Sequence, residues 1–135
     1  MAYVLPRRLA LSLALLAPAC AALSAPLAAC PPQQRQGSQA ALLDSASVFY
    51  GAPEKKVELQ PDFANLEWDL AADQQDARAR GETIHLVCKY KGIKSTVTLK
   101  LAYEATLCKA EGIRNRMVVS CSAAPNDSGA TPNKD

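Results

Sequence analysis

The chain has 135 residues, with 15 lysine and arginine side chains, 13 aspartate and glutamate side chains, and one histidine. Two of the basic residues, Arg7 and Arg8, lie in an N-terminal segment that we expect to be removed, and the rest of the chain then carries no net charge. This balance excludes a strongly basic nucleic-acid-binding domain. The length allows one small domain with a modest core.

Residues 1–29 have the layout of a secretory signal peptide. Arg7 and Arg8 precede a run rich in leucine and alanine, and small residues follow. The cleanest apolar stretch, residues 9–17, is much shorter than the roughly 20 residues that span a bilayer. We therefore expect export to the periplasm.

The first part of the exported chain combines polar segments with short apolar runs. Residues 30–40 are polar and lack periodicity, and they predict an extended arm. Apolar residues follow at 42–50. The sequence Val57-Glu58-Leu59 predicts a short strand that ends at Pro61.

The segment 66–70 alternates apolar and polar residues, so Leu66, Trp68 and Leu70 are predicted to share the buried face of a strand. Residues 71–81, A-A-D-Q-Q-D-A-R-A-R-G, include helix-forming residues but have almost no apolar stripe. We expect an exposed loop or one loose helical turn there.

The strongest pattern covers residues 83–121 and predicts two β-hairpins. The first turns at Gly92 and has one apolar and one polar face. Its apolar face comprises Ile84, Leu86, Cys88, Tyr90, Val97, Leu99 and Leu101. The predicted fold is therefore mainly β: a small antiparallel sheet or sandwich of five to seven short strands with hairpins, stapled by disulfides. It forms one domain over 30–122, and a disordered tail is expected over 123–135.

Cysteine spacing predicts the two disulfides. One of the five cysteines lies in the signal peptide, which leaves four in an oxidising compartment. If the second hairpin turns at Arg114-Asn115, Cys108 faces Cys121 within bridging distance. The pair Cys30–Cys88 follows by elimination and would pin the N-terminal arm to the central strand.

Cys30 also has a second interpretation. The sequence Leu27-Ala28-Ala29-Cys30 fits a lipoprotein cleavage site, which would make Cys30 a lipid-bearing first residue anchored to the outer membrane. Ordinary cleavage after Ala22 or Ala19 is the alternative. Lipidation requires one free thiol among the remaining cysteines, whereas the disulfide interpretation requires none. Membrane contact is expected only if Cys30 is lipidated.

The basic hairpin K-Y-K-G-I-K places Lys89, Lys91 and Lys94 close together in sequence. Their charges are candidates for contact with an anionic envelope surface or an acidic protein. Lysine on surface strands also prevents unwanted sheet pairing, which explains the same residues without a ligand.

The sequence offers little for catalysis. His85 is the only histidine, and a general base needs a partner within reach. The pair His85 and Cys88 forms the one H-x-x-C, but residues three apart on a strand point to opposite faces. No phosphate loop or hydrolase motif occurs, so neither a cofactor nor a metal is expected. A small hydrolase that uses His85 is kept as an alternative.

Several short motifs occur together along the exported chain: Cys30-Pro31, V-F-Y-G-A-P, W-D-L-A, C-K-Y-K-G, T-L-K-L, Cys108 and a final V-S-C. As a set, they resemble a family of small, exported, uncharacterised proteins of Gram-negative bacteria. The resemblance implies export and a cysteine framework, and it supplies no activity.

The chain is also similar to periplasmic lysozyme inhibitors, which are small, disulfide-stapled β domains. Their S-G-x-x-Y loop is absent, because Ser128-Gly129 has no tyrosine after it. We therefore expect a non-catalytic binding or structural module of the envelope with no enzyme activity. The sequence does not identify its partner, for which an envelope protein and an anionic envelope surface are the candidates. The alternative is a lipid-anchored, inhibitor-like protein that binds a partner such as a lysozyme.

Overall fold

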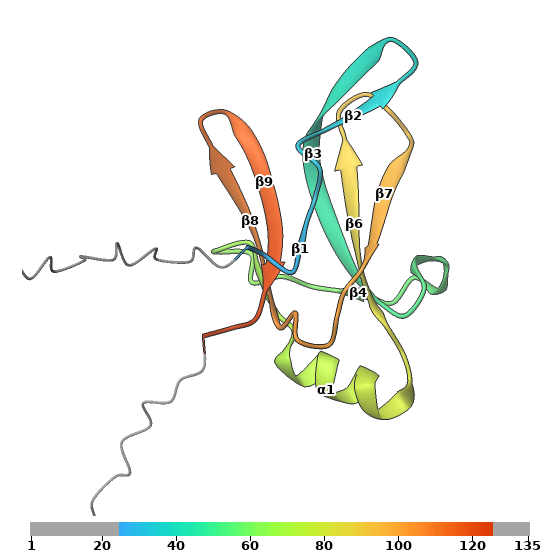
Figure 1. Ribbon diagram of the computed structural model, residues 1–135, viewed down its shortest axis with the longest axis vertical. Helices are drawn as coiled ribbons and strands as arrows, with labels where there is room; N and C mark the ends of the chain where they lie inside the picture. The colour runs from blue at the N-terminus through green and yellow to red at the C-terminus, as the bar shows by residue number, and fades with distance from the viewer. Residues whose placement is uncertain (1–24, 126–135) are drawn as a thin grey trace, which may run out of the picture.

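The structure is a computed structural model, and it describes residues 25–125. Most of the expected signal peptide and most of the expected tail, residues 1–24 and 126–135, lie outside the described residues. Two antiparallel sheets, one α-helix and one short 3-10 helix make up the described part (Figure 1). The mainly β fold class is therefore confirmed.

The larger sheet has the strand order β2-β3-β6-β7, with β4 paired to β3 outside this path. Its strands are β2 (Gln33–Gln36), β3 (Gln39–Tyr50), β4 (Glu58–Leu59), β6 (Ile84–Tyr90) and β7 (Thr96–Lys100). The segment 30–40, expected as an extended arm, contributes β2 and returns to β3 through Gly37, whose positive φ of 63° suits a tight turn.

The smaller sheet has the order β1-β9-β8-β5. Its strands are β1 (Ala28–Ala29), β5 (Glu67–Asp69), β8 (Leu107–Ile113) and β9 (Arg116–Ser122). Strands β8 and β9 form the second predicted hairpin. Both turn residues, Arg114 and Asn115, have positive φ, as a two-residue hairpin turn requires. The described residues thus form nine strands, of which β1 and β4 have two residues each.

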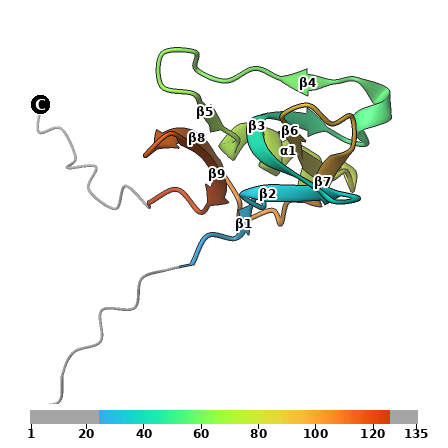
Figure 2. The same ribbon diagram turned by 90° about the horizontal axis from the view of Figure 1, so that it is seen from above.

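The core lies where the two sheets meet, with β9 packed beside β3 (Figures 1 and 2). The predicted apolar face of β6 is buried along its whole length and belongs to the same core cluster as residues of β8 and β9. The fully buried large side chains include Leu70, Ile84, Leu86, Val48 and Val119. Strict alternation along β6 produces this face, since successive side chains of a strand point to opposite sides.

Each disulfide ties different parts of this core. Cys30 follows β1 of the smaller sheet and is bonded to Cys88 in β6 of the larger sheet, with 5.7 Å between the Cα atoms. Cys108 and Cys121 join β8 to β9 with 4.0 Å between the Cα atoms, and they are directly opposed in the register. One disulfide therefore links the two sheets, and the other closes a hairpin.

The segment 71–80 is neither the exposed loop nor the single loose helical turn expected from the sequence, but a ten-residue helix, α1 (Ala71–Arg80). The helix ends at Gly81, which adopts the left-handed conformation and donates its N–H to carbonyls of the last turn. Only Gln74 and Ala77 of the helix are buried. Gln74 Nε2 donates to the carbonyls of Ala102 and Ala105 at 3.0 and 2.9 Å. The helix therefore docks through a polar side chain, which an apolar-stripe criterion does not detect.

None of the helices within residues 25–125 combines the length and the apolar character needed to cross a membrane.

Candidate protein-binding surface

The loop between β4 and β5, residues 60–66, is organised by one aspartate. Asp62 Oδ1 accepts the N–H of Ala64 at 3.0 Å, and Oδ2 accepts the Nδ2 amide of Asn65 at 3.0 Å. The Asp62 N–H donates to the carbonyl of Glu67 at 2.7 Å, which closes the loop at its base. An aspartate that bonds the backbone two residues ahead is a recurrent way to fix a turn.

Leu66 closes this loop in a conformation that the sequence did not predict. Its φ is 51°, a region that a bulky residue rarely adopts, and its side chain is 40% exposed. Two main-chain bonds hold it: the Leu66 N–H donates to the Asp62 carbonyl at 2.7 Å, and the Leu66 carbonyl accepts from the Ala110 N–H at 3.0 Å. The predicted buried face of segment 66–70 is therefore wrong at Leu66 and right at Trp68 and Leu70.

Phe63 stands in this loop with 72% of its surface exposed, more than any other large apolar residue that the structure describes. Beside it lies a groove of about 240 Å³. Its apolar lining includes Phe63, Leu66, Trp68, Ala110 and Met117. Trp68 forms part of this lining from a fixed position, because its Nε1 donates to the carbonyl of Leu59 at 3.0 Å. The groove therefore presents apolar side chains on a backbone that hydrogen bonds hold in place.

A second groove, of about 290 Å³, borders the same loop and is acidic. It is lined by Gln60, Pro61, Asp62, Glu67, Asp69 and Leu107. Glu67 and Asp69 point to one side of β5 while Trp68 points to the other, since side chains alternate along a strand. Lys109 Nζ pairs with Glu67 Oε1 at 3.2 Å, and the groove is lined by no lysine or arginine of residues 25–125. We call the two grooves together, with Phe63, the loop surface.

The outer face of the larger sheet presents a different surface. Its groove, of about 470 Å³, crosses β6 and β7 and is lined by His85, Val87, Lys89, Thr96, Thr98 and Lys100, among others. The register places His85 opposite Lys100 and Lys89 opposite Thr96. Lys89 Nζ donates to Ser47 Oγ at 3.0 Å. Within residues 25–125, neither Lys89 nor Lys100 has a carboxylate partner within 4.0 Å. We call this area the basic face.

The three lysines singled out in the sequence do not line one groove. Lys89 belongs to the basic face, whereas Lys91 lines a separate groove with Leu42, Leu43 and Arg116. Lys94 lies in the turn between β6 and β7 and lines neither groove. Contact of all three with a single anionic surface stays a prediction from the sequence.

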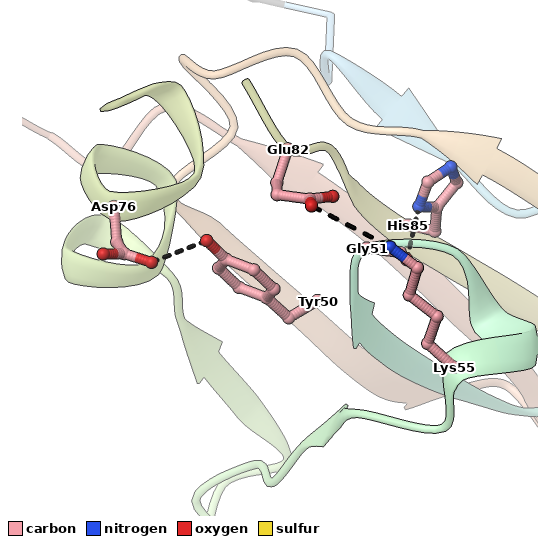
Figure 3. Close-up of polar contacts among 6 residues, drawn as sticks. All are labelled: Tyr50, Gly51, Lys55, Asp76, Glu82 and His85. Atoms are coloured by element: carbon pink, nitrogen blue, oxygen red, sulfur yellow. Dashed lines mark hydrogen bonds and ion pairs between the residues drawn. The ribbon is translucent and has the colours of Figure 1, made fainter. Parts of the chain in front are cut away.

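His85 lies near the start of β6 and is held by a main-chain contact. Its Nδ1 lies 2.8 Å from the carbonyl of Gly51, and since a carbonyl only accepts, Nδ1 carries the proton (Figure 3). This bond orients the ring, but it supplies no acid to activate it, and no carboxylate is hydrogen-bonded to His85 in the described chain. The hydrolase hypothesis gains no geometric support here.

Two further polar contacts lie near His85: one joins α1 to β3 of the larger sheet, and the other joins the 3-10 turn η1 (Pro53–Lys55) to the segment between α1 and β6 (Figure 3). Tyr50 donates its hydroxyl to Asp76 of α1 at 2.6 Å, and Lys55 lies 3.9 Å from Glu82. The bond to the Asp76 carboxylate raises the pKa of Tyr50 to about 12. The same bond, with a second one from Arg80, lowers the pKa of Asp76. The Tyr50–Asp76 bond therefore attaches α1 to β3.

No group of three or more histidine, cysteine, aspartate or glutamate side chains in residues 25–125 is arranged to hold a metal ion. The acids around the helix serve other contacts instead. Asp69 Oδ1 accepts the Ala71 N–H at 3.1 Å, and the Asp76 carboxylate accepts hydrogen bonds from Tyr50 and Arg80.

Phe63 and its loop were missed by the sequence analysis. The signal was present in P-D-F-A-N, residues 61–65, where turn-forming residues flank an aromatic one. Turn chemistry on both sides predicts that the aromatic side chain lies in a surface loop, where few neighbours can cover it.

The fold and these surfaces define a class: a small, disulfide-stapled β domain with open surfaces suited to a macromolecular partner. A model of the type VI secretion system Tli immunity protein family matches residues 35–124, and the chain belongs to this family. A search of curated proteins and a search of solved structures each gave no match.

Membership refines the expectations from the sequence. The chain does belong to a family of small proteins, as the resemblance implied. The resemblance supplied no activity, whereas the family that matches is described as an immunity protein family. An immunity protein acts on a toxin effector, so the inhibitor-like alternative with a protein partner describes it better than a module without a stated role. Membership also indicates a non-enzymatic role, and the periplasmic location common among such proteins fits the expected export.

Proposed function

We propose that this protein protects its producer by binding a type VI toxin effector and blocking it, without catalysis. The observation that carries the proposal is Phe63, a large aromatic side chain 72% exposed on a loop that hydrogen bonds hold in place. Exposed aromatic anchors contribute most of the affinity in many interfaces. A loop that is already ordered loses little conformational entropy on binding.

The test is stoichiometric inhibition. Effectors of the producing strain's own type VI system are purified one by one, and the activity of each is titrated with this protein. Activity of the cognate effector should fall linearly and vanish near one equivalent, with a stable complex on size exclusion. A reduced and alkylated sample is the control, since it loses both disulfides. Full activity of every effector under excess immunity protein would contradict the proposal.

The same titration examines the alternatives kept from the sequence. Inhibition of a lysozyme but of no type VI effector would favour the lysozyme-inhibitor alternative. For the hydrolase alternative, a broad substrate screen with His85→Ala as the inactive reference is the measurement. We expect no activity in that screen, because His85 is oriented by a carbonyl rather than by an acid.

We propose that the protein acts in the periplasm as a disulfide-bonded chain without a lipid at Cys30. The sulfur of Cys30 is bonded to Cys88, and one sulfur atom cannot also hold a lipid thioether. Ala28 and Ala29 pair with β9, and the Cys30 N–H donates to the Val119 carbonyl at 2.9 Å. Cleavage after Ala22 retains these contacts, whereas cleavage after Ala29 removes β1.

Intact mass under non-reducing conditions tests this processing. The expected result is a chain that begins at Leu23, carries no lipid and resists alkylation until it is reduced. A diacylglyceryl mass on Cys30, together with one alkylatable thiol, would overturn it.

A further inference from the structure

The two grooves of the loop surface adjoin each other. Gln60 and Pro61 line both, so the apolar groove and the acidic groove meet at these two residues. Strand β5 is the wall between them, with Trp68 on the apolar side and Glu67 and Asp69 on the acidic side. A partner that fills one groove therefore has its neighbouring residues at the entrance of the other.

The chemistry of the grooves restricts what can fill them. The apolar groove offers aromatic and aliphatic walls around Phe63, which gain free energy by excluding water from a large apolar side chain. The acidic groove is lined by Asp62, Glu67 and Asp69, and of these three Glu67 forms an ion pair, with Lys109. Its excess of negative charge favours a lysine or arginine side chain.

We propose, on the basis of the immunity function above, that the loop surface recognises a basic segment of the effector in which a large apolar side chain neighbours a lysine or arginine. The apolar side chain packs against Phe63 and Leu66, the two exposed apolar residues of the groove. The basic side chain lies in the acidic groove and approaches Asp69 and Glu67. Rigidity of the loop positions both contacts before the effector arrives.

A second copy of this chain is a poorer occupant. A symmetric dimer through the loop surface would place the acidic groove near its own copy, and like charges repel. The basic face offers the apolar groove no large apolar side chain as exposed as Phe63, because Val87 is 6% exposed and Phe49 is only partly exposed. The charges and the apolar groove together therefore favour a partner other than a second copy of this chain.

The experiment measures the dissociation constant of the effector identified by the inhibition titration, using wild type and variants. Phe63→Ala should weaken binding roughly tenfold or more, with Phe63→Leu intermediate. Asp69→Asn retains the oxygen that accepts the Ala71 N–H and removes only the charge. It should weaken binding about three- to tenfold and flatten the salt dependence of the association rate.

Two matched controls separate this surface from general effects. Leu42→Ala removes an apolar side chain of similar character, 43% exposed, that lies outside both grooves. Lys100→Gln removes a charge from the basic face. Both should bind like wild type, and all variants should keep the wild-type unfolding midpoint, since each replaced side chain is exposed.

The outcomes distinguish the two proposals. If wild type binds an effector and Phe63→Ala and Asp69→Asn bind equally well, the assignment of the loop surface is overturned while the immunity function stands. Loss of binding in Lys100→Gln alone would move the interface to the basic face. Dimerisation that Phe63→Ala abolishes would make a second copy the occupant. If wild type binds no effector, both proposals fail.

Discussion

The loop surface and the basic face both expose charged side chains to solvent, but they differ in how exposed the neighbouring apolar side chains are. On the basic face, lysines and threonines of a regular sheet surround apolar residues that are buried, as Val87 is, or only partly exposed, as Phe49 is. On the loop surface, carboxylates border an apolar groove whose aromatic wall remains exposed. Surface lysines on a strand keep a sheet soluble and unpaired. An exposed aromatic residue on an ordered loop has no such role in the isolated domain, and this difference favours the loop surface as the interface.

The largest effects are expected when the disulfides are removed, and this removal tests how the two surfaces depend on the rest of the fold. Cys30–Cys88 spans 58 residues and Cys108–Cys121 spans 13. Loop-closure entropy predicts that replacing the first pair by alanine costs about 4 kcal/mol and the second about 3 kcal/mol. Urea unfolding of the two double variants measures both.

Loss of the two disulfides should also affect the two surfaces differently. Trp68 is directly opposite Cys108 in the register, so loss of Cys108–Cys121 should loosen the loop surface first. Hydrogen exchange of the main chain at 60–69, compared with 84–90, reports this order. Equal loosening of both segments would show that the hairpin disulfide does not support the loop surface specifically.

A smaller change addresses the rigidity of the loop. Asp62→Ala removes the acceptor of the Ala64 N–H and of the Asn65 amide, at a local cost of about 1 kcal/mol for each bond. We expect faster amide exchange at Ala64 and weaker effector binding, although Phe63 is retained. Asp62→Asn is the matched control, because it keeps one acceptor oxygen for Ala64. Unchanged exchange in Asp62→Ala would mean that the main-chain bonds alone hold the loop.

The Tyr50–Asp76 bond gives a pH-dependent prediction for the helix attached to the larger sheet. The pKa of Tyr50 is raised from 10.0 to about 12, so its contribution to stability is complete below pH 10 and is lost as the pH rises toward about 12. The pKa of Asp76 is lowered, so its contribution is present above the ordinary value of 3.8 and is lost as the pH falls below it.

Thermal unfolding of wild type and Tyr50→Phe across this range measures the effect. The difference in melting temperature should be constant at neutral pH and should shrink toward both extremes. Effector affinity at neutral pH should not change, because Tyr50 lines neither groove of the loop surface. A difference that grows above pH 10 would contradict the assignment of the bond.

The smallest effect is expected on the basic face. Lys89→Gln and Lys100→Gln together should change effector affinity by less than about twofold, since exposed charges away from an interface contribute little. Binding to anionic vesicles, with and without the triple change Lys89→Ala, Lys91→Ala and Lys94→Ala, tests the sequence-based expectation for these lysines. Salt-sensitive vesicle binding that the triple change removes would give these lysines a role of their own.

The alternation of residues 84–90 and the turn at Arg114-Asn115 were enough to predict the central strand and the opposition of Cys108 and Cys121. Both signals are local, because the direction of each side chain follows from strand geometry and the register follows from the turn. The charge of Lys89, Lys91 and Lys94 was also visible, but their separation into different parts of the surface was not.

The β class, the two hairpins and the cysteine framework therefore follow from patterns along the chain. The helix at 71–80 depends instead on tertiary contacts, since it docks through Gln74, whose amide donates to the carbonyls of Ala102 and Ala105. The tertiary structure also decided that Leu66 turns outward and that Phe63 remains uncovered beside an acidic groove. Strand patterns are set by neighbours along the chain, whereas exposure is set by which distant segments fold over a residue, and no local pattern encodes that.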